Sequence, residues 1–530
     1  MTTSLAAPTA TAAASSPAPL GRGRASRALA LLAAGALTTA ALAAGACTRG
    51  QGTTPPGGRT GLVPTPVDGG TDASGRTWPA PPPPTAPKPV VFPEVGTFRL
   101  ANGLSVYVVE NHEVPLVSAE LVIRCGTMDD PHLASFTAAM LGEGTRSRSK
   151  AKLDEAIEFV GGTLGAGAST HTSTVHARSL DKDLKLAMLL MADEVQNPVF
   201  PPEALGKLKQ TAKSALRINR SQPDVLADTL LDDVIYPDGH PYGRPLGTDA
   251  QIDAITLDDI RRFHETFYRA NNGFLLLSGA ITLDEAKPLV ERAFGGWAAA
   301  EPSSLPPNPL NVFTRYELPG ELRVHLVDRP DSAQATIRVG NLALARNHED
   351  WAALQVANEI LGGGPNARLF QDIREERSLT YGISSKVGKG QAPSTFVIAT
   401  ETRTPTTGEM LAAIFEHIER LRTEQTPRRE FEATVRKIVG AFPLEVETAE
   451  QVVDLVREQL VYGLPPSYWK DYRQGITEVE LSEVRKAALR YIHALPVVVV
   501  VGNAAQIRPQ LSQVLPTATI VEYDAVLRRK

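Results

Sequence analysis

Two segments of the chain repeat the same order of apolar and polar positions. Residues 115–125 and 333–342 alternate apolar and polar side chains, which predicts half-buried strands. Residues 133–141 and 351–361 follow with apolar side chains three and four positions apart, which predicts amphipathic helices. The repetition of strand and helix indicates an internal duplication.

The two copies also end alike. Residues 274–279 and 496–502 are apolar runs that end in glycine, and each is followed by an amphipathic helix. Gly279 and Gly502 lie about 220 residues apart. We therefore expect an α+β fold with two homologous halves, each of which mixes strands and helices.

The halves are predicted as domains at residues 95–300 and 310–530, joined by the proline-rich segment 301–309. Helices dominate between the landmarks described above. Apolar side chains at helical spacing predict further helices at residues 180–195, 202–220, 406–422, 428–439 and 449–462.

The first 47 residues have the pattern of an export signal. Arg22, Arg24 and Arg27 precede an uncharged run at residues 28–46. The run ends in Ala-Gly-Ala-Cys, which resembles a bacterial lipoprotein processing site with Cys47 as the lipidated residue. We predict a lipid-anchored protein of the cell envelope, at the outer membrane or facing the periplasm. Simple secretion and an uncleaved membrane anchor are the alternatives.

Residues 48–94 are rich in proline and poor in apolar side chains, so we predict a disordered tether. The net charge of −5 and the isoelectric point near 6.1 provide no basic surface for nucleic acid. The chain has two cysteines, which excludes a disulfide framework. Cys125 falls in an apolar strand pattern and is predicted to be a buried small side chain.

Four stretches, taken in order, resemble the insulinase/pitrilysin metallopeptidase family. Residues 102–110 are similar to its first hairpin, and residues 240–248 (HPYGRPLGT) to a stretch of its bacterial members. Residues 368–381 (RLFQDIREERSLTY) resemble its second-half signature. Residues 132–145 (HLASFTAAMLGEGT) resemble its metal-binding helix, an H-x-x-E-H motif. The resemblance implies two α/β-sandwich-like halves of the processing-peptidase type.

The resemblance does not extend to the family's zinc ligands and catalytic glutamate. Ser135, Ala138 and Ala139 stand where the two histidines and the glutamate are expected. The resemblance places the third ligand, a glutamate, at Ala215. Alanine has no lone pair for a metal, so we predict no zinc site and no cofactor on this chain. Other polar side chains near the motif are interpreted as solvated or hydrogen-bonded: His132, Glu143, His171 and His176, with the two last on opposite faces of one strand.

Two residues of the second half retain the family pattern. In the family, an arginine and a tyrosine seven residues apart hold the substrate backbone and stabilise charge on the scissile carbonyl; here these are Arg374 and Tyr381. The alternative is an ion pair of Arg374 on a helix surface and a core-strand position for Tyr381. Gly362, Gly363 and Gly364 fit a helix C-cap. The resemblance adds that some noncatalytic family subunits use a glycine-rich loop here to engage substrate.

These features lead to two competing hypotheses and a third, weaker one. The first is a noncatalytic subunit that pairs with a zinc-bearing homologous chain and binds peptide or unfolded substrates in the cell envelope, with zinc on the partner. The second is a lipid-anchored, self-associating pseudopeptidase that captures peptides or scaffolds an envelope complex without cleavage. The third is a hydrolase with an unrelated site, for which Ser135 and His132 lack a nucleophile elbow.

Overall fold

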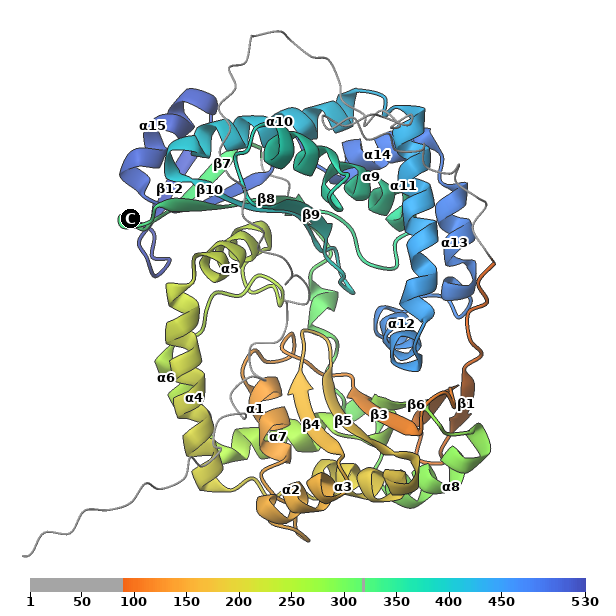
Figure 1. The fold of residues 1–530 in the computed structure, drawn as a ribbon. Coiled ribbons are helices and arrows are strands. Elements are labelled where there is room, and N and C mark those ends of the chain that lie inside the picture. The colour runs from red at the N-terminus through yellow and green to blue at the C-terminus, as the bar shows by residue number, and fades with distance from the viewer. Residues whose placement is uncertain (1–88, 317–319) are drawn as a thin grey trace, which may run out of the picture. The chain divides into compact units, whose positions relative to one another are not determined.

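A computed structural model describes residues 89–316 and 320–530, which fall within one compact unit. Two six-stranded mixed sheets organise these residues, and helices cover them (Figure 1). The predicted signal, its Cys47 and nearly all of the predicted tether lie outside the described residues. Among the helices that are described, none combines the length and the apolar character that a bilayer crossing requires.

The first half builds its sheet from strands that are separated by helices. Its strands are β1 (Gly96–Arg99), β2 (Ser105–Glu110), β3 (Leu116–Ile123), β4 (Thr163–Ala168), β5 (Ser173–Leu180) and β6 (Gly273–Gly279). Its helices are α1 (Leu133–Leu141), α2 (Lys150–Phe159), α3 (Leu184–Gln196), α4 (Pro202–Ser221), α5 (Pro223–Ile235), α6 (Asp249–Ala254), α7 (Leu257–Phe267) and α8 (Leu283–Phe294).

The second half repeats this plan. Its strands are β7 (Arg323–Asp328), β8 (Gln334–Leu342), β9 (Ile383–Val387), β10 (Thr395–Arg403), β11 (Val497–Gly502) and β12 (Thr519–Tyr523). Its helices are α9 (Trp351–Gly362), α10 (Thr407–Thr423), α11 (Arg428–Ala441), α12 (Ala449–Tyr462), α13 (Tyr468–Glu478), α14 (Leu481–Tyr491) and α15 (Ala504–Val514), with a π-helix at Phe370–Glu376.

The two sheets have matching topology. The first is ordered β1-β2-β6-β3-β5-β4 and the second β12-β7-β11-β8-β10-β9. In each sheet the central strand, β6 or β11, is parallel to one neighbour and antiparallel to the other. Only the outermost strand differs, since β1 is antiparallel to β2 whereas β12 is parallel to β7. The expected duplicated α+β fold is confirmed.

Each central strand is buried along almost its whole length. This explains why residues 274–277 and 497–501 are continuous apolar runs rather than alternating ones. One face of each sheet packs on the helices of its own half. The other face is covered by a helix that comes from the opposite half.

This exchange of helices is reciprocal. Helix α5 leaves the first half and packs on β8 and β11, where four of its side chains join a cluster with strand valines (Leu226, Ala227, Leu230 and Leu231). Helix α12 leaves the second half and packs on β2 and β6. Figure 1 shows both helices lying against these sheets. Burial of each large aliphatic side chain contributes on the order of 2 kcal/mol.

A charged residue at the same position of each sheet binds the incoming helix. Glu120 of β3 lies opposite Leu276 of β6, three residues before Gly279. Arg338 of β8 lies opposite Val499 of β11, three residues before Gly502. The Glu120 carboxylate is 2.5 Å from a guanidinium nitrogen of Arg457 on α12. The duplicated position therefore holds opposite charges in the two halves.

The second of these ion pairs is more extensive. The Arg338 side chain is 8% exposed, and its nitrogens lie 2.7 Å from Asp224 and 2.5 Å from Asp228 on α5. Arg329 also donates to the carbonyl oxygens of residues 220 and 221, at the end of α4. The second half thus fixes both the turn between α4 and α5 and the first turns of α5.

The helices predicted from periodicity are present, with small shifts at their ends. Residues 133–141 and 449–462 form helices with the predicted bounds. The helix predicted from residue 180 begins instead at Leu184. Leu180 is the last residue of β5, and a short turn at Asp181–Asp183 separates strand from helix. The domain limits at 95–300 and 310–530 stay a prediction, because α5 and α12 each pack on the opposite half.

Removing both carboxylates that bind Arg338 should destabilise the protein strongly. We expect D224N/D228N to lower the free energy of unfolding by about 3 kcal/mol, because it leaves a buried guanidinium unpaired. R338M should cost less, since the two carboxylates are 56% and 58% exposed and water can hydrate them. Urea denaturation followed by circular dichroism measures both effects.

Asp454→Asn is the matched control for this prediction. Asp454 pairs with Arg457 on the exposed side of α12, while Arg457 keeps Glu120. We expect a loss below about 1 kcal/mol. A loss for D224N/D228N as small as that of the control would contradict the assigned role of Arg338.

Candidate functional site

Helix α1 carries the residues that the sequence resemblance places at the zinc motif. Its apolar face enters the first core, and the helix contacts β4, α4 and α7. Ser135 and Ala139 lie one turn apart and are half-buried, and Ala138 is buried. Ala215 lies half-buried on α4, a helix that contacts α1.

These residues do not fit a zinc ion. Zinc requires lone pairs from imidazole, thiolate or carboxylate groups, and this set offers one hydroxyl and three methyl groups. Across residues 89–316 and 320–530, no group of three or more His, Cys, Asp or Glu side chains is arranged to hold a metal. We derive no chemistry through a metal bound to this chain.

The other polar side chains near α1 each have a separate structural partner. The ring of His132 packs on Gly247, and Glu143 lies 3.5 Å from Lys150. His171 Nε2 is 2.6 Å from the Tyr242 hydroxyl, and His176 packs on Gly165 of β4. The expectation that His171 and His176 share a strand is wrong. Only His176 lies on β5, because residues 169–172 form the turn between β4 and β5.

The stretch at residues 240–248 forms a turn and a packing corner. His240 is fully buried, and its ring stacks on Tyr236 at 4.5 Å between centroids. Arg244 donates to the carbonyl oxygens of Thr127 and Met128, at 2.8 Å each. The stretch therefore fixes the loop that leads into α1.

Arg374 lies on a π-helix, Phe370–Glu376, rather than on an α-helix. Such wide turns are rare and occur frequently at functional sites. Ser378, just beyond it, has a φ of 54°, a left-handed conformation that is costly for a residue with a side chain. Two unfavourable backbone features thus lie within the nine residues 370–378.

Arg374 and Tyr381 lie together. The Arg374 Nε donates to the Tyr381 carbonyl oxygen at 2.8 Å, and its guanidinium lies over the ring of Phe370 at 4.6 Å. The predicted ion pair of Arg374 is also present, with Glu375. The Tyr381 side chain does not enter a core strand. It lies two residues before β9 and is 92% exposed.

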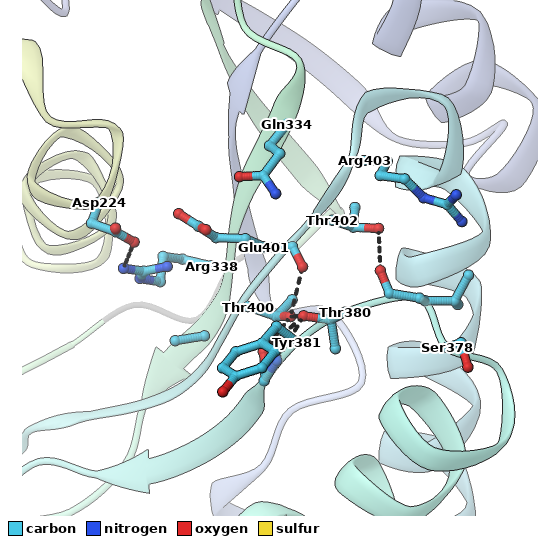
Figure 2. Close-up of a pocket in the computed structure, with 13 residues that line it drawn as sticks. Asp224, Gln334, Arg338, Ser378, Thr380, Tyr381, Thr400, Glu401, Thr402 and Arg403 are labelled. Carbon is cyan, nitrogen blue, oxygen red and sulfur yellow. Dashed lines mark hydrogen bonds and ion pairs between the residues drawn. The ribbon is translucent and has the colours of Figure 1, made fainter. Parts of the chain in front are cut away.

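A pocket of about 480 Å³ lies beside Tyr381. Strands β8 and β10, the segment 378–382 and the start of α5 line it. In Figure 2 the Arg338–Asp224 ion pair and Arg403 lie on either side of the threonines of this pocket. Thr402 donates to the Leu379 carbonyl at 2.8 Å, and Thr400 to that of Gly382 at 3.0 Å. The loop that carries Tyr381 is therefore fastened to β10.

Close packing explains the three glycines at the end of α9, residues 362–364. A side chain at Gly362 would lie 2.5 Å from the Ser385 hydroxyl of β9, and one at Gly363 would contact Glu359. One at Gly364 would lie 2.9 Å from Lys437 of α11. The proposed engagement of substrate by this loop stays a prediction.

Sequence reasoning missed the residues behind the Arg374 segment. Asp372 points to α10, where His417 lies 2.8 Å from its carboxylate. Arg377 also binds Asp372. The two partners of the His417 contact are 45 positions apart, so no local spacing in the sequence indicates it.

Comparison with known proteins agrees with this fold. Residues 105–247 match the family described as insulinase (peptidase family M16), and residues 254–438 match the peptidase M16 inactive domain. These two regions cover more than half of the chain. The chain belongs to the M16 insulinase family of peptidases, which confirms the resemblance identified from its motifs.

Individual relatives support the same family and fold. An uncharacterized zinc protease of Streptomyces coelicolor is 26% identical, over 77% of this chain and 90% of its own. The crystal structure of a peptidase M16 inactive domain from Pseudomonas fluorescens has a TM-score of 0.68 at 26% identity, over 77% of this chain and 98% of its own. A protease from Helicobacter pylori has the same fold, with a TM-score of 0.69 at 18% identity over 77% of this chain and 99% of its own.

Replacing Ser378 with glycine should relieve backbone strain. Glycine adopts positive φ without a Cβ clash, so we expect S378G to raise the free energy of unfolding by about 1 kcal/mol. Ser214→Gly is the control, since Ser214 is an exposed serine inside α4. Glycine there should lower stability by about 0.5 kcal/mol. Equal effects of the two substitutions would contradict the strain at Ser378.

Acidification should weaken the fold through His171. Burial lowers the pKa of His171 from 6.5 to about 4, so the folded protein favours the neutral ring. Above pH 6.5 the ring is neutral in both the folded and the unfolded chain. As the pH falls from 6.5 through 4, the unfolded chain binds a proton first, and the free energy of unfolding falls by up to about 3 kcal/mol. We expect H171Q to be less stable at neutral pH but to lose less stability on acidification. Urea midpoints measured across this range test the prediction.

Proposed function

We propose that this chain is a noncatalytic, substrate-binding subunit of a heteromeric zinc-dependent peptidase. Its substrates would be peptides or unfolded segments in the cell envelope, and its partner a homologous chain that carries the zinc. The observation that supports this is an asymmetry. The metal positions hold Ser135, Ala138, Ala139 and Ala215, whereas the second half presents Arg374 and an exposed Tyr381 on a strained segment.

Backbone strain in this segment is informative, although Ile373 and Leu379 also anchor the segment in the core. A π-helix and a left-handed serine reduce stability, and such features cluster at functional sites. The Tyr381 ring is 92% exposed and lies 5.6 Å from the Arg374 guanidinium carbon, so it adds little to the core of this chain. These costs are understandable if the segment presents Tyr381 and Arg374 to another molecule.

The two side chains have the chemistry for a peptide carbonyl. The Arg374 Nε is occupied by the Tyr381 carbonyl, which fixes the direction of the guanidinium. The Tyr381 hydroxyl has no hydrogen-bond partner among the described residues, so it remains available as a donor. A fixed guanidinium and a free phenol can stabilise negative charge on a carbonyl oxygen.

This role predicts a loss of activity in the assembled enzyme. The chain is co-expressed and co-purified with a candidate zinc-bearing homologue, which is sought among the neighbouring genes, and cleavage of an unfolded peptide is measured. We expect R374A and Y381F each to lower kcat by about 100-fold, because each removes a donor to the developing charge.

Arg429→Ala is the matched control, since Arg429 is an exposed arginine on α11 of the same half. It should leave kcat unchanged. Full activity of R374A and Y381F in a complex that cleaves peptide would refute the assigned roles. Stoichiometric zinc in the isolated chain would refute the division of labour.

A second candidate function is peptide binding without cleavage, and strand β4 favours it. This strand is an edge of the first sheet and pairs only with β5 among the described residues. Its residues 165–168 are glycine and alanine, and a side chain added at Gly167 would meet open space. An extended peptide could add to this edge beside α1 through main-chain hydrogen bonds.

The two functions are separated by two experiments on the isolated chain. Fluorescence anisotropy with an unfolded peptide measures binding, and a peptide with N-methylated backbone amides tests strand addition. Binding that the N-methyl groups abolish, with no zinc-bearing partner recovered, would favour the second function. In both cases we propose attachment to the cell envelope through Cys47, which metabolic labelling with a fatty acid and the variant C47A would test.

A further inference from the structure

A buried histidine lies directly behind the segment that carries Arg374. His417 belongs to α10 and is 3% exposed. Its Nε2 is 2.8 Å from the Asp372 carboxylate, which belongs to the π-helix. Asp372 is two residues before Arg374, so the contact reaches the backbone that positions the arginine.

Asp372 is held at both its side chain and its main chain. Its carboxylate accepts from the Arg377 guanidinium, with Nε at 3.0 Å from Oδ1 and a terminal nitrogen at 2.9 Å from Oδ2. Its carbonyl oxygen accepts the Arg377 main-chain N–H at 2.8 Å. This i to i+5 hydrogen bond defines a π turn. The hydrogen bonds between Asp372 and Arg377 therefore stabilise the π turn.

The same network ties the turn to α10. Arg377 reaches Glu416 at 3.1 Å, and His417 is the next residue on that helix. Asp372 and Arg374 project to different sides of the segment. The first meets α10, and the second donates to the Tyr381 carbonyl. The His417–Asp372 contact on the buried side can therefore hold the direction of the Arg374 side chain on the exposed side.

The surroundings of His417 define its hydrogen-bonding state. Its Nδ1 is buried and has no hydrogen-bond partner among the described residues. A proton there would be a buried donor without an acceptor, which is costly. The ring is therefore neutral, with its proton on Nε2, where Asp372 accepts it.

We propose that His417 is a positioning residue for the Arg374–Tyr381 pair, acting through Asp372 on the π-helix. The effect that we expect on activity rests on the proposed function. The effect that we expect on the π-helix does not. His417 touches neither Arg374 nor Tyr381. It donates one hydrogen bond that keeps the wide turn closed, and Arg377 supplies the others.

Hydrogen exchange in the isolated full chain tests the structural content. H417L removes the donor, so the amides of Arg377 and Leu379, which close the turn, should exchange at least about tenfold faster. H417Q keeps a side-chain N–H donor and should restore most of the protection. D372N keeps an acceptor but removes the charge, and should fall between them.

H325L is the matched control. His325 is a buried histidine of the same half, on β7, and its Nδ1 is 2.9 Å from the Tyr523 hydroxyl. It should not accelerate exchange at residues 370–382 selectively. Equal acceleration by H417L and H325L, or no acceleration by H417L, would overturn the proposal. If H417L does not fold, D372N decides it: the amides of Arg377 and Leu379 should exchange faster than in H325L, and equal exchange would overturn the proposal.

Activity gives a second, separable readout. In the complex with a zinc-bearing partner, H417L should lower kcat by about tenfold with little change in KM, and H417L/R374A should be no less active than R374A. Additive losses would overturn positioning. If R374A itself has no effect, the proposed function fails, while the exchange data still decide the role of His417.

Discussion

The exchange of helices between the two sheets is the constraint on which the rest of the structure depends. Each sheet has one face that its own half does not cover, and a helix from the other half covers it. Glu120 and Arg338, at the duplicated strand position, bind the incoming helices with opposite charges. Neither half can bury its central strand alone, so we infer that the halves fold as one cooperative unit.

This constraint also arranges the candidate site. Helix α5 enters the second half through the Arg338–Asp224 pair, and its first turn becomes a wall of the pocket beside Tyr381. The segment that carries Arg374 contains a π-helix and a left-handed serine, and threonine hydroxyls and the Asp372 network hold it on two sides. In the first half, α1 carries Ser135, Ala138 and Ala139 at the positions that resemble a metal-binding motif. In the second half, Arg374 lies on a π-helix and Tyr381 is exposed.

Periodicity predicted much of the fold because strands such as β3, β5 and β10 alternate buried and more exposed positions, and most helices have one apolar side. The bounds of α1 and α12 follow directly from that pattern. The π-helix was not predictable, because residues 370–376 have the composition of an ordinary helix. The exposure of Tyr381 was not predictable either, since a tyrosine before a strand is compatible with a core position.

The sequence by itself determined the duplication and the family, and it predicts the loss of every zinc ligand, because these depend on residue identity and order. Alanine at residues 138, 139 and 215 excludes metal coordination at those positions in any conformation. Only the tertiary structure decided which helix covers which sheet, and which residue supports Arg374. Arg338 binds α5 of the first half, and Asp372 binds His417, which lies 45 positions away. Contacts at such separations are set by packing of whole elements, and local sequence patterns do not encode them.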